Sequence, residues 1–188
     1  MTEFSVLIVD DDIWMQRILA KTMESYGFKK TLLAGDGFEG IALAVEHTPL
    51  IIIMDIMMPE LNGLLALKIL KRIKTTKKIP ILMVSALSDT ENLTMAVKYG
   101  TAGFISKPFT KATVYDKLTN IFGTEKLEQI ARGEDVQFDS DSFMSIGMED
   151  LKAQFNLFDE FTPSPDSADQ PATPDKAPAA AAKPNPIA

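Results

Sequence analysis

The chain has no cysteine and only one histidine, His47. Without thiols it can form no disulfide, no thiolate metal site and no cysteine nucleophile, which suits a reducing compartment. His47 stands near the end of a helical segment, just before Pro49. We expect it to be exposed at a helix end, and to be neither a metal ligand nor a phosphocarrier. We expect a cytoplasmic location.

Long hydrophobic runs are also missing. The longest, residues 50–58, is interrupted by Asp55 and is far shorter than the roughly 20 apolar residues that cross a bilayer as a helix. The N-terminus has only a short apolar run, residues 6–9, before three aspartates, so it lacks the features of a signal peptide. We expect a soluble protein that makes no use of a membrane.

An excess of positive charge, which nucleic-acid binding requires, is absent too. The net charge is -7, and residues 1–123 hold 14 Lys/Arg and 13 Asp/Glu, or +1, whereas residues 124–188 hold 5 and 13, or -8. The acidic C-terminal part repels a phosphate backbone and contains no basic recognition helix. We therefore expect no nucleic-acid partner and no DNA-binding output domain.

Short β-rich apolar runs alternate with segments of helical length along the first two thirds of the chain. This pattern predicts an α/β fold whose mostly parallel sheet is covered by helices on both faces. We expect the flavodoxin-like, doubly wound arrangement of five strands in the order 2-1-3-4-5. The expected strands are residues 4–9, 30–34, 50–54, 79–84 and 103–105; the clearest helices are residues 13–26, 64–73 and 111–122.

The domain is expected to span residues 1–123 and to be followed by a C-terminal tail of two parts. Residues 124–161 are acidic, and Leu151, Phe155 and Phe158 recur at helical spacing. They predict an amphipathic helix that docks in a partner, covers the domain's own signalling face, or has no regulatory role. Residues 162–188 are rich in proline and alanine, a composition typical of disorder.

Polar residues follow four of the expected strands. Asp10 and Asp11 follow the first, Asp55 the third, Ser85 lies at the end of the fourth, and Lys107 follows the fifth. Ligands of open parallel sheets bind at the carboxyl ends of the strands, where the strand order reverses. Three carboxylates repel each other there, and a divalent cation relieves that repulsion. Hard oxygen ligands favour Mg²⁺, as phosphoryl transfer to a carboxylate requires.

These residues resemble the receiver domain of two-component response regulators, including the chemotaxis type, over residues 4–122. The resemblance rests on four motifs: Leu7-Ile8-Val9-Asp10-Asp11, Met54-Asp55-Ile56-Met57-Met58-Pro59 with Gly63 following, Val84-Ser85-Ala86, and Gly100 through Phe104 to Lys107-Pro108-Phe109. It implies a stand-alone receiver that accepts a phosphoryl group from a histidine kinase or a histidine phosphotransfer protein. Such a receiver is not an enzyme; it signals by contact with an output protein, which the sequence does not identify.

The resemblance also assigns roles to individual residues. Asp55 would be the phosphoacceptor, and Asp11 and Asp55 would bind Mg²⁺ with the Met57 carbonyl, while Asp10 acts through a water of the metal. Lys107 and Ser85 would stabilise the phosphoryl group. Ser85 and Phe104 would form the switch pair, and the Lys107–Pro108 bond would be cis. Met57 and Leu87, at positions that tune phosphoryl lifetime, are apolar and predict slow self-hydrolysis.

Three other readings of the sequence compete with a receiver. In a haloacid-dehalogenase-like phosphatase, Asp10 and Asp12 would be followed by a threonine where Trp14 stands. A flavodoxin would have a Ser/Thr-rich phosphate loop after the first strand, which is missing. A phosphorylation-independent scaffold that uses the acidic tail is the remaining alternative, and an intact acidic pocket disfavours it.

Overall fold

The computed structural model describes residues 4–86, 90–134 and 136. Strands and helices alternate along this part of the chain, as the sequence predicts. The elements are β1 (Ser5–Val9), α1 (Ile13–Ser25), β2 (Lys30–Ala34), α2 (Gly37–His47), β3 (Ile51–Asp55), α3 (Gly63–Leu70), β4 (Ile81–Ala86), α4 (Thr90–Lys98), β5 (Gly103–Lys107), α5 (Lys111–Phe122) and α6 (Thr124–Arg132).

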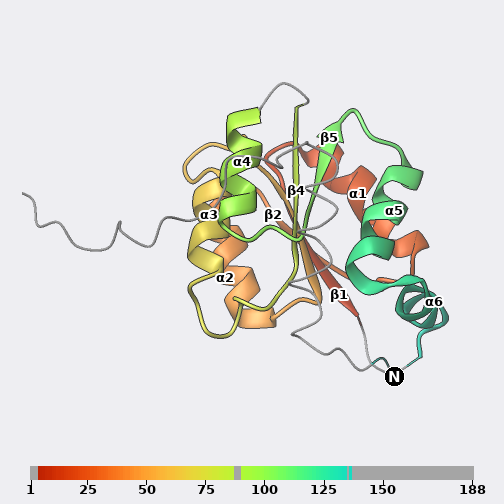
Figure 1. Ribbon diagram of the computed structural model, residues 1–188. Coiled ribbons are helices and arrows are strands. Elements are labelled where there is room, and N and C mark those ends of the chain that lie inside the picture. The colour runs from red at the N-terminus through yellow and green to blue at the C-terminus, as the bar shows by residue number, and fades with distance from the viewer. Residues whose placement is uncertain (1–3, 87–89, 135, 137–188) are drawn as a thin grey trace, which may run out of the picture. The chain divides into compact units, whose positions relative to one another are not determined.

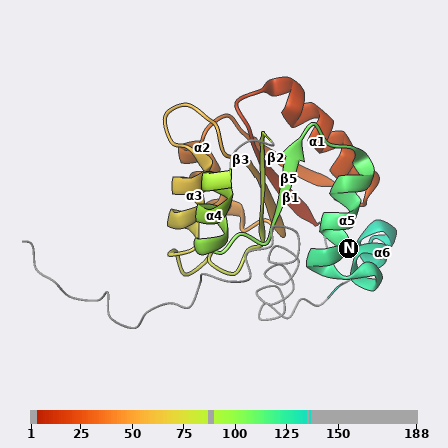
Figure 2. The same cartoon turned by 45° about the horizontal axis from the view of Figure 1, so that its top comes forward.

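The five strands form one parallel sheet in the order β2-β1-β3-β4-β5. Helices α2, α3 and α4 cover one face, and α1 and α5 cover the other (Figures 1 and 2). Residues Val6–Val9 of β1 and all of β3 are buried, because both faces of these strands pack under helices. The expected doubly wound fold and its strand order are therefore confirmed.

Short polar residues fix where the helices begin. One such residue, in extended conformation, precedes each of α1, α2, α3 and α5, and its side-chain oxygen accepts a hydrogen bond from a backbone N–H of the first turn. In chain order these residues are Asp12, Asp36, Asn62 and Thr110. Such caps satisfy amide groups that have no partner inside the helix. The caps place each helix directly after the loop at the carboxyl end of the preceding strand.

Several boundaries differ from the prediction by a few residues. Strand β3 includes Asp55, so this carboxylate lies on the strand and not after it. Strand β4 begins at Ile81 and not at residue 79, because Pro80 has no N–H to donate to a ladder. Helix α3 ends at Leu70 and not at residue 73; the hydroxyl of Thr76 donates to the Leu70 carbonyl there (2.8 Å).

Helix α6 follows Gly123, where the sequence predicts the end of the domain. Gly123 has a φ of 81° and separates α6 from α5. Leu127 and Ile130 of α6 are buried in the same apolar cluster as Phe28 and Phe122. Packing therefore continues to the end of α6 at Arg132, a feature that the sequence analysis does not anticipate.

The predicted docking residues Leu151, Phe155 and Phe158 lie outside the described residues, as does the Pro/Ala-rich segment 162–188. Both assignments stay predictions. Among the helices of the described ranges, none combines the length and the apolar character needed to span a bilayer.

Candidate functional site

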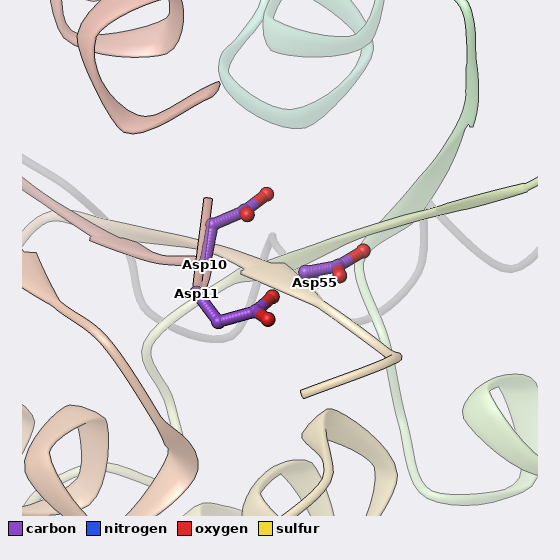
Figure 3. A group of neighbouring side chains, drawn as sticks. All are labelled: Asp10, Asp11 and Asp55. Atoms are coloured by element: carbon purple, nitrogen blue, oxygen red, sulfur yellow. The ribbon is translucent and has the colours of Figure 1, made fainter. Parts of the chain in front are cut away.

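Three carboxylates meet at the carboxyl end of the sheet. Asp10 and Asp11 follow β1 directly, and Asp55 is the last residue of the neighbouring β3. One oxygen from each of the three lies within 4.8 Å of the others, and Figure 3 shows the side chains side by side. Asp10 and Asp55 are buried, while Asp11 is exposed. The topology thus brings together the three acidic residues that the sequence predicts to lie at this end of the sheet.

Lys107, the last residue of β5, reaches into this group from across the sheet. Its Nζ lies 3.1 Å from Asp10 Oδ2 and 3.1 Å from Asp55 Oδ1. The Lys107–Pro108 bond that follows is cis, as the resemblance implies. One ammonium therefore contacts two buried carboxylates, and the third carboxylate, Asp11, faces solvent.

Burial raises the pKa of Asp55, because the ionised carboxylate loses solvation there. The Lys107 ammonium lowers this pKa in part, and the charge of Asp10 raises it again. For Lys107, burial lowers the pKa, but hydrogen bonds and charge interactions with Asp10 and Asp55 outweigh burial and raise it. Lys107 is therefore held as a cation, and Asp55 ionises less readily than a free aspartate.

The backbone around Asp10 is held by two groups. The Gln16 amide on α1, itself buried, donates to the carbonyls of Asp10 (2.7 Å) and Ala34 (2.9 Å), the latter at the end of β2. The N–H of Asp12 donates to Asp10 Oδ1 (2.9 Å). Gln16 is not among the residues predicted from the sequence, although a polar side chain on the buried face of α1, shared with Leu19, is a usable signal.

The loop after Asp55 turns sharply and returns to the strand end. Gly63 N–H donates to the Ile56 carbonyl (3.0 Å), and a Cβ on Gly63 would overlap with the Asp55 carbonyl oxygen. Only glycine therefore fits at the start of α3. In this loop the Met57 side chain is 66 % exposed. The role of the Met57 carbonyl as a metal ligand stays a prediction.

Ser85 lies near the end of β4, the neighbour of β3 on the side away from β1. Its Oγ is buried and has no hydrogen-bond partner among the described residues. A buried hydroxyl without a partner costs about 1–3 kcal/mol. An oxygen acceptor arriving at this end of the sheet would satisfy it, which agrees with the predicted contact to a phosphoryl group.

Phe104 on β5 is buried in the apolar cluster beneath α2, α3 and α4. Three positions earlier in the chain, the Thr101 hydroxyl contacts the carbonyls of Ile81 and Gly103, both at 2.8 Å. Thr101 is thus held by hydrogen bonds to β4 and β5. Leu87 lies outside the described residues, so its assignment stays a prediction.

The donors at the site fit a magnesium ion. Asp10, Asp11 and Asp55 offer only hard carboxylate oxygens, close enough to share one ion. Mg²⁺ is commonly held by one or two carboxylates and keeps several waters. Asp11 is exposed and leaves room for those waters. The chemistry of the donors, together with the repulsion between three clustered carboxylates, supports the predicted metal.

Comparison with known proteins agrees with this geometry. Residues 6–119, more than half of the chain, match the family model of the response regulator receiver domain. Chemotaxis protein CheY-3 of Vibrio cholerae is 34% identical over 117 residues, which cover 62% of this chain and 90% of CheY-3. A probable chemotaxis protein CheY of Rhizobium etli is 29% identical over 124 residues, which cover 66% of this chain and 96% of the relative.

Solved structures show the same likeness. CheY4 of Vibrio cholerae aligns with a TM-score of 0.59 and 29% identity, over 63% of this chain and 98% of CheY4. A complex of CheX, CheY, BeF3 and Mg²⁺ from Borrelia burgdorferi contains a chain that aligns with a TM-score of 0.60 and 30% identity, over 63% of this chain and 89% of that one. These similarities cover the part of the chain that carries Asp10, Asp55 and Lys107.

Proposed function

The chain belongs to the response regulator receiver family, and from this premise we propose that Asp55 accepts a phosphoryl group and that the protein signals this event by contact with another protein. The observation that carries the proposal is the position of Lys107, whose Nζ lies 3.1 Å from both Asp10 and Asp55. A cation held there neutralises oxygens that arrive at Asp55.

In the transfer step, an oxygen of the ionised Asp55 attacks the phosphorus of a phosphohistidine on a histidine kinase or histidine phosphotransfer protein. A P–O bond to Asp55 forms, the P–N bond of the donor breaks, and its electron pair returns to the imidazole, which then takes up a proton. Lys107 moves from the carboxylate to the incoming phosphoryl oxygens. The chain supplies position and charge, as is general for phosphoryl transfer.

Asp10, Asp11 and Asp55 are the side chains that would hold Mg²⁺, with the Met57 carbonyl as a further ligand. The ion would supply positive charge to the transferred oxygens and would offset the repulsion among the carboxylates. The magnesium named with the Borrelia burgdorferi CheY complex supports the same metal here.

The buried hydroxyl of Ser85 would then donate to a phosphoryl oxygen. This contact draws the end of β4 toward Asp55, and Phe104 on the adjacent β5 repacks with it. The surface formed by α4 and β5 changes as a result, and an output protein reads that change. In Borrelia burgdorferi a CheY forms a complex with CheX, which supports action by protein–protein contact.

One experiment tests the assignment. The full chain is incubated with Mg²⁺ and acetyl phosphate, and the adduct is followed by intact mass. We expect one added phosphoryl group that is lost in base and survives brief mild acid. Asp55→Asn should abolish it, while Asp12→Asn, a change in the neighbouring helix cap, should retain it. An adduct that persists in Asp55→Asn would overturn the proposal and favour a phosphorylation-independent scaffold.

A further inference from the structure

The outward sides of α2 and α3 are apolar. On α2, Phe38 and Val45 are 61 % and 43 % exposed, and on α3, Leu65 and Ile69 are 45 % and 39 % exposed. Ala42, which lies between Phe38 and Val45 on the same side of α2, is exposed as well. These five residues, which we call the α2/α3 face, form a stripe at helical spacing on each helix.

Such a face is unusual for helices that cover a sheet, since their solvent side is normally polar. The inner sides of both helices are apolar too, with Ala44 of α2 and Leu67 of α3 buried in the core. The two helices are therefore apolar nearly all round. Contiguous apolar surface of this kind marks interaction sites.

The two helices lie side by side (Figures 1 and 2) and start at the same level. Each follows a strand of the parallel sheet, so both run in the same direction. Gly37 at the start of α2 donates its N–H to the Leu61 carbonyl just before α3 (3.2 Å). Phe38 is the second residue of α2 and Leu65 the third of α3, so the two lie within one residue of the same level, as do Ala42 and Ile69.

Charge is divided between the helices. The acidic side chains belong to α2, as Glu39 and Glu46. The basic ones belong to α3 and the residues after it, as Lys68 and Arg72. Glu46 stands nine positions after the start of α2, and Arg72 nine after the start of α3, so acid and base lie at the same level on opposite helices.

We propose that the α2/α3 face binds a second copy of this chain, through a two-fold axis parallel to the helices. That axis sets α2 of one protomer against α3 of its partner at the same level. Phe38 then meets Leu65, Ala42 meets Ile69 and Glu46 meets Arg72, so apolar residues and opposite charges both match. An axis across the helices would instead set the acidic α2 against itself.

The dimer should be weak. Two helices of 11 and 8 residues offer less surface than the ~800 Å² per partner that is typical of stable interfaces. The contact uses α2 and α3 and does not include α4 or β5, whose surface carries the proposed output. Each dimer therefore presents two signalling domains at once, which strengthens binding to any partner with two docking sites.

The absence of cysteine allows a clean cross-linking test. Full-length Ala42→Cys and Ile69→Cys proteins are treated with a mild oxidant, separately and as a mixture, and the disulfide-linked products are separated by mass. We expect the Ala42–Ile69 pair to dominate in the mixture. Trp14→Cys is the control, because Trp14 is exposed too (71 %) but lies on α1. It should form no more disulfide-linked product than random collisions give. Products without preference for the mixed pair would overturn the proposed pairing.

Sedimentation of the unmodified chain and of charge variants gives an independent readout. The full chain should show a concentration-dependent shift from monomer to dimer. Glu46→Arg and Arg72→Glu should each weaken the dimer by on the order of tenfold, and the double variant should recover much of the loss. Circular dichroism confirms that the variants fold. A chain that stays monomeric at all concentrations, or a double variant no better than the singles, would overturn the proposal.

Discussion

The Lys107 ammonium lies equally far, at 3.1 Å, from one oxygen of Asp10 and one of Asp55. One positive charge therefore contacts two buried carboxylates on neighbouring strands. Lys107, Asp10 and Asp55 together keep a net negative charge, and Asp11 lies beside them. Burial raises the pKa of Asp55, and the Lys107 ammonium offsets this rise only in part, while the charge of Asp10 adds to it. Several measurable properties depend on it.

Replacing the phosphoacceptor should stabilise the fold. Because the pKa of Asp55 is above its ordinary value of 3.8, the folded protein binds this proton more tightly than the unfolded chain does. Stability from Asp55 is then greatest below pH 3.8 and falls as pH rises through the folded pKa. We expect Asp55→Asn to raise the free energy of unfolding at neutral pH by roughly 0.5–2 kcal/mol, and this gain to shrink toward pH 3.8. Urea unfolding of both proteins across pH measures the difference, and a gain that does not vary with pH would contradict this explanation.

Magnesium should stabilise the protein by binding only to the folded state. At a concentration one hundred times the dissociation constant the expected stabilisation is about 2.7 kcal/mol, seen as a rise in melting temperature. Asp11→Asn should remove most of this rise, since it takes away an exposed ligand without disturbing the core. Asp12→Asn is the control, because Asp12 caps α1 and is not one of the three clustered carboxylates. An equal loss in both variants would show a general charge effect.

Gln16 should act as a positioning residue for Asp10. In Gln16→Leu, the carbonyls of Asp10 and Ala34 lose the donor that ties them together, so the acidic end of β1 is held less firmly. We expect the affinity for Mg²⁺ to fall by about tenfold, as for other groups that orient metal ligands. Trp14, the only tryptophan, stands three residues after Asp11 in the sequence and provides a fluorescence signal for the titration.

The control for Gln16 is Thr22→Val on the same helix. Thr22 is buried and donates to the Ile18 carbonyl (2.8 Å), within α1 and away from Asp10. This variant should lose stability and keep the affinity for Mg²⁺. If both variants lose affinity in proportion to stability, the role of Gln16 is structural only.

The lifetime of the phosphoryl group should depend on Met57. Its side chain is 66 % exposed in the loop after Asp55 and has no group that can orient an attacking water. Met57→Asn supplies an amide that can do so, and we expect dephosphorylation to accelerate by about an order of magnitude, within the usual range for positioning effects. Release of phosphate after removal of the donor measures the rate, with Met57→Leu as the apolar control. Equal rates in all three proteins would refute this role.

The fold and the acidic site could be predicted from sequence because their signals are local. Runs such as residues 50–54 identify strands buried on both faces, and the parallel topology then brings Asp10, Asp55 and Lys107 to one edge. The predicted third strand ends one residue before β3 does, since an aspartate after an apolar run resembles a loop residue.

Other features depend on contacts that no local pattern encodes. Helix α6 packs where Gly27 exposes bare backbone, since a Cβ on Gly27 would overlap with Ala131. No sequence pattern around residue 124 predicts that packing. The partners of Gln16 come from the ends of two strands, so they are known only once β1 and β2 pair. The α2/α3 face likewise exists only because the two helices pack side by side, which the sequence of neither helix predicts.

The close approach of Gly63 to the Asp55 carbonyl makes the two sides of strand β3 different. Helix α3 begins against the backbone of the phosphoacceptor, with no room for displacement toward it, whereas the Ser85 hydroxyl on the opposite side has a contact still to make. A signal from Asp55 should therefore travel through β4 and β5 and leave the α2/α3 face as it was. The affinity of the dimer would then be the same before and after phosphorylation. Each of its two protomers would switch without changing the contact between them.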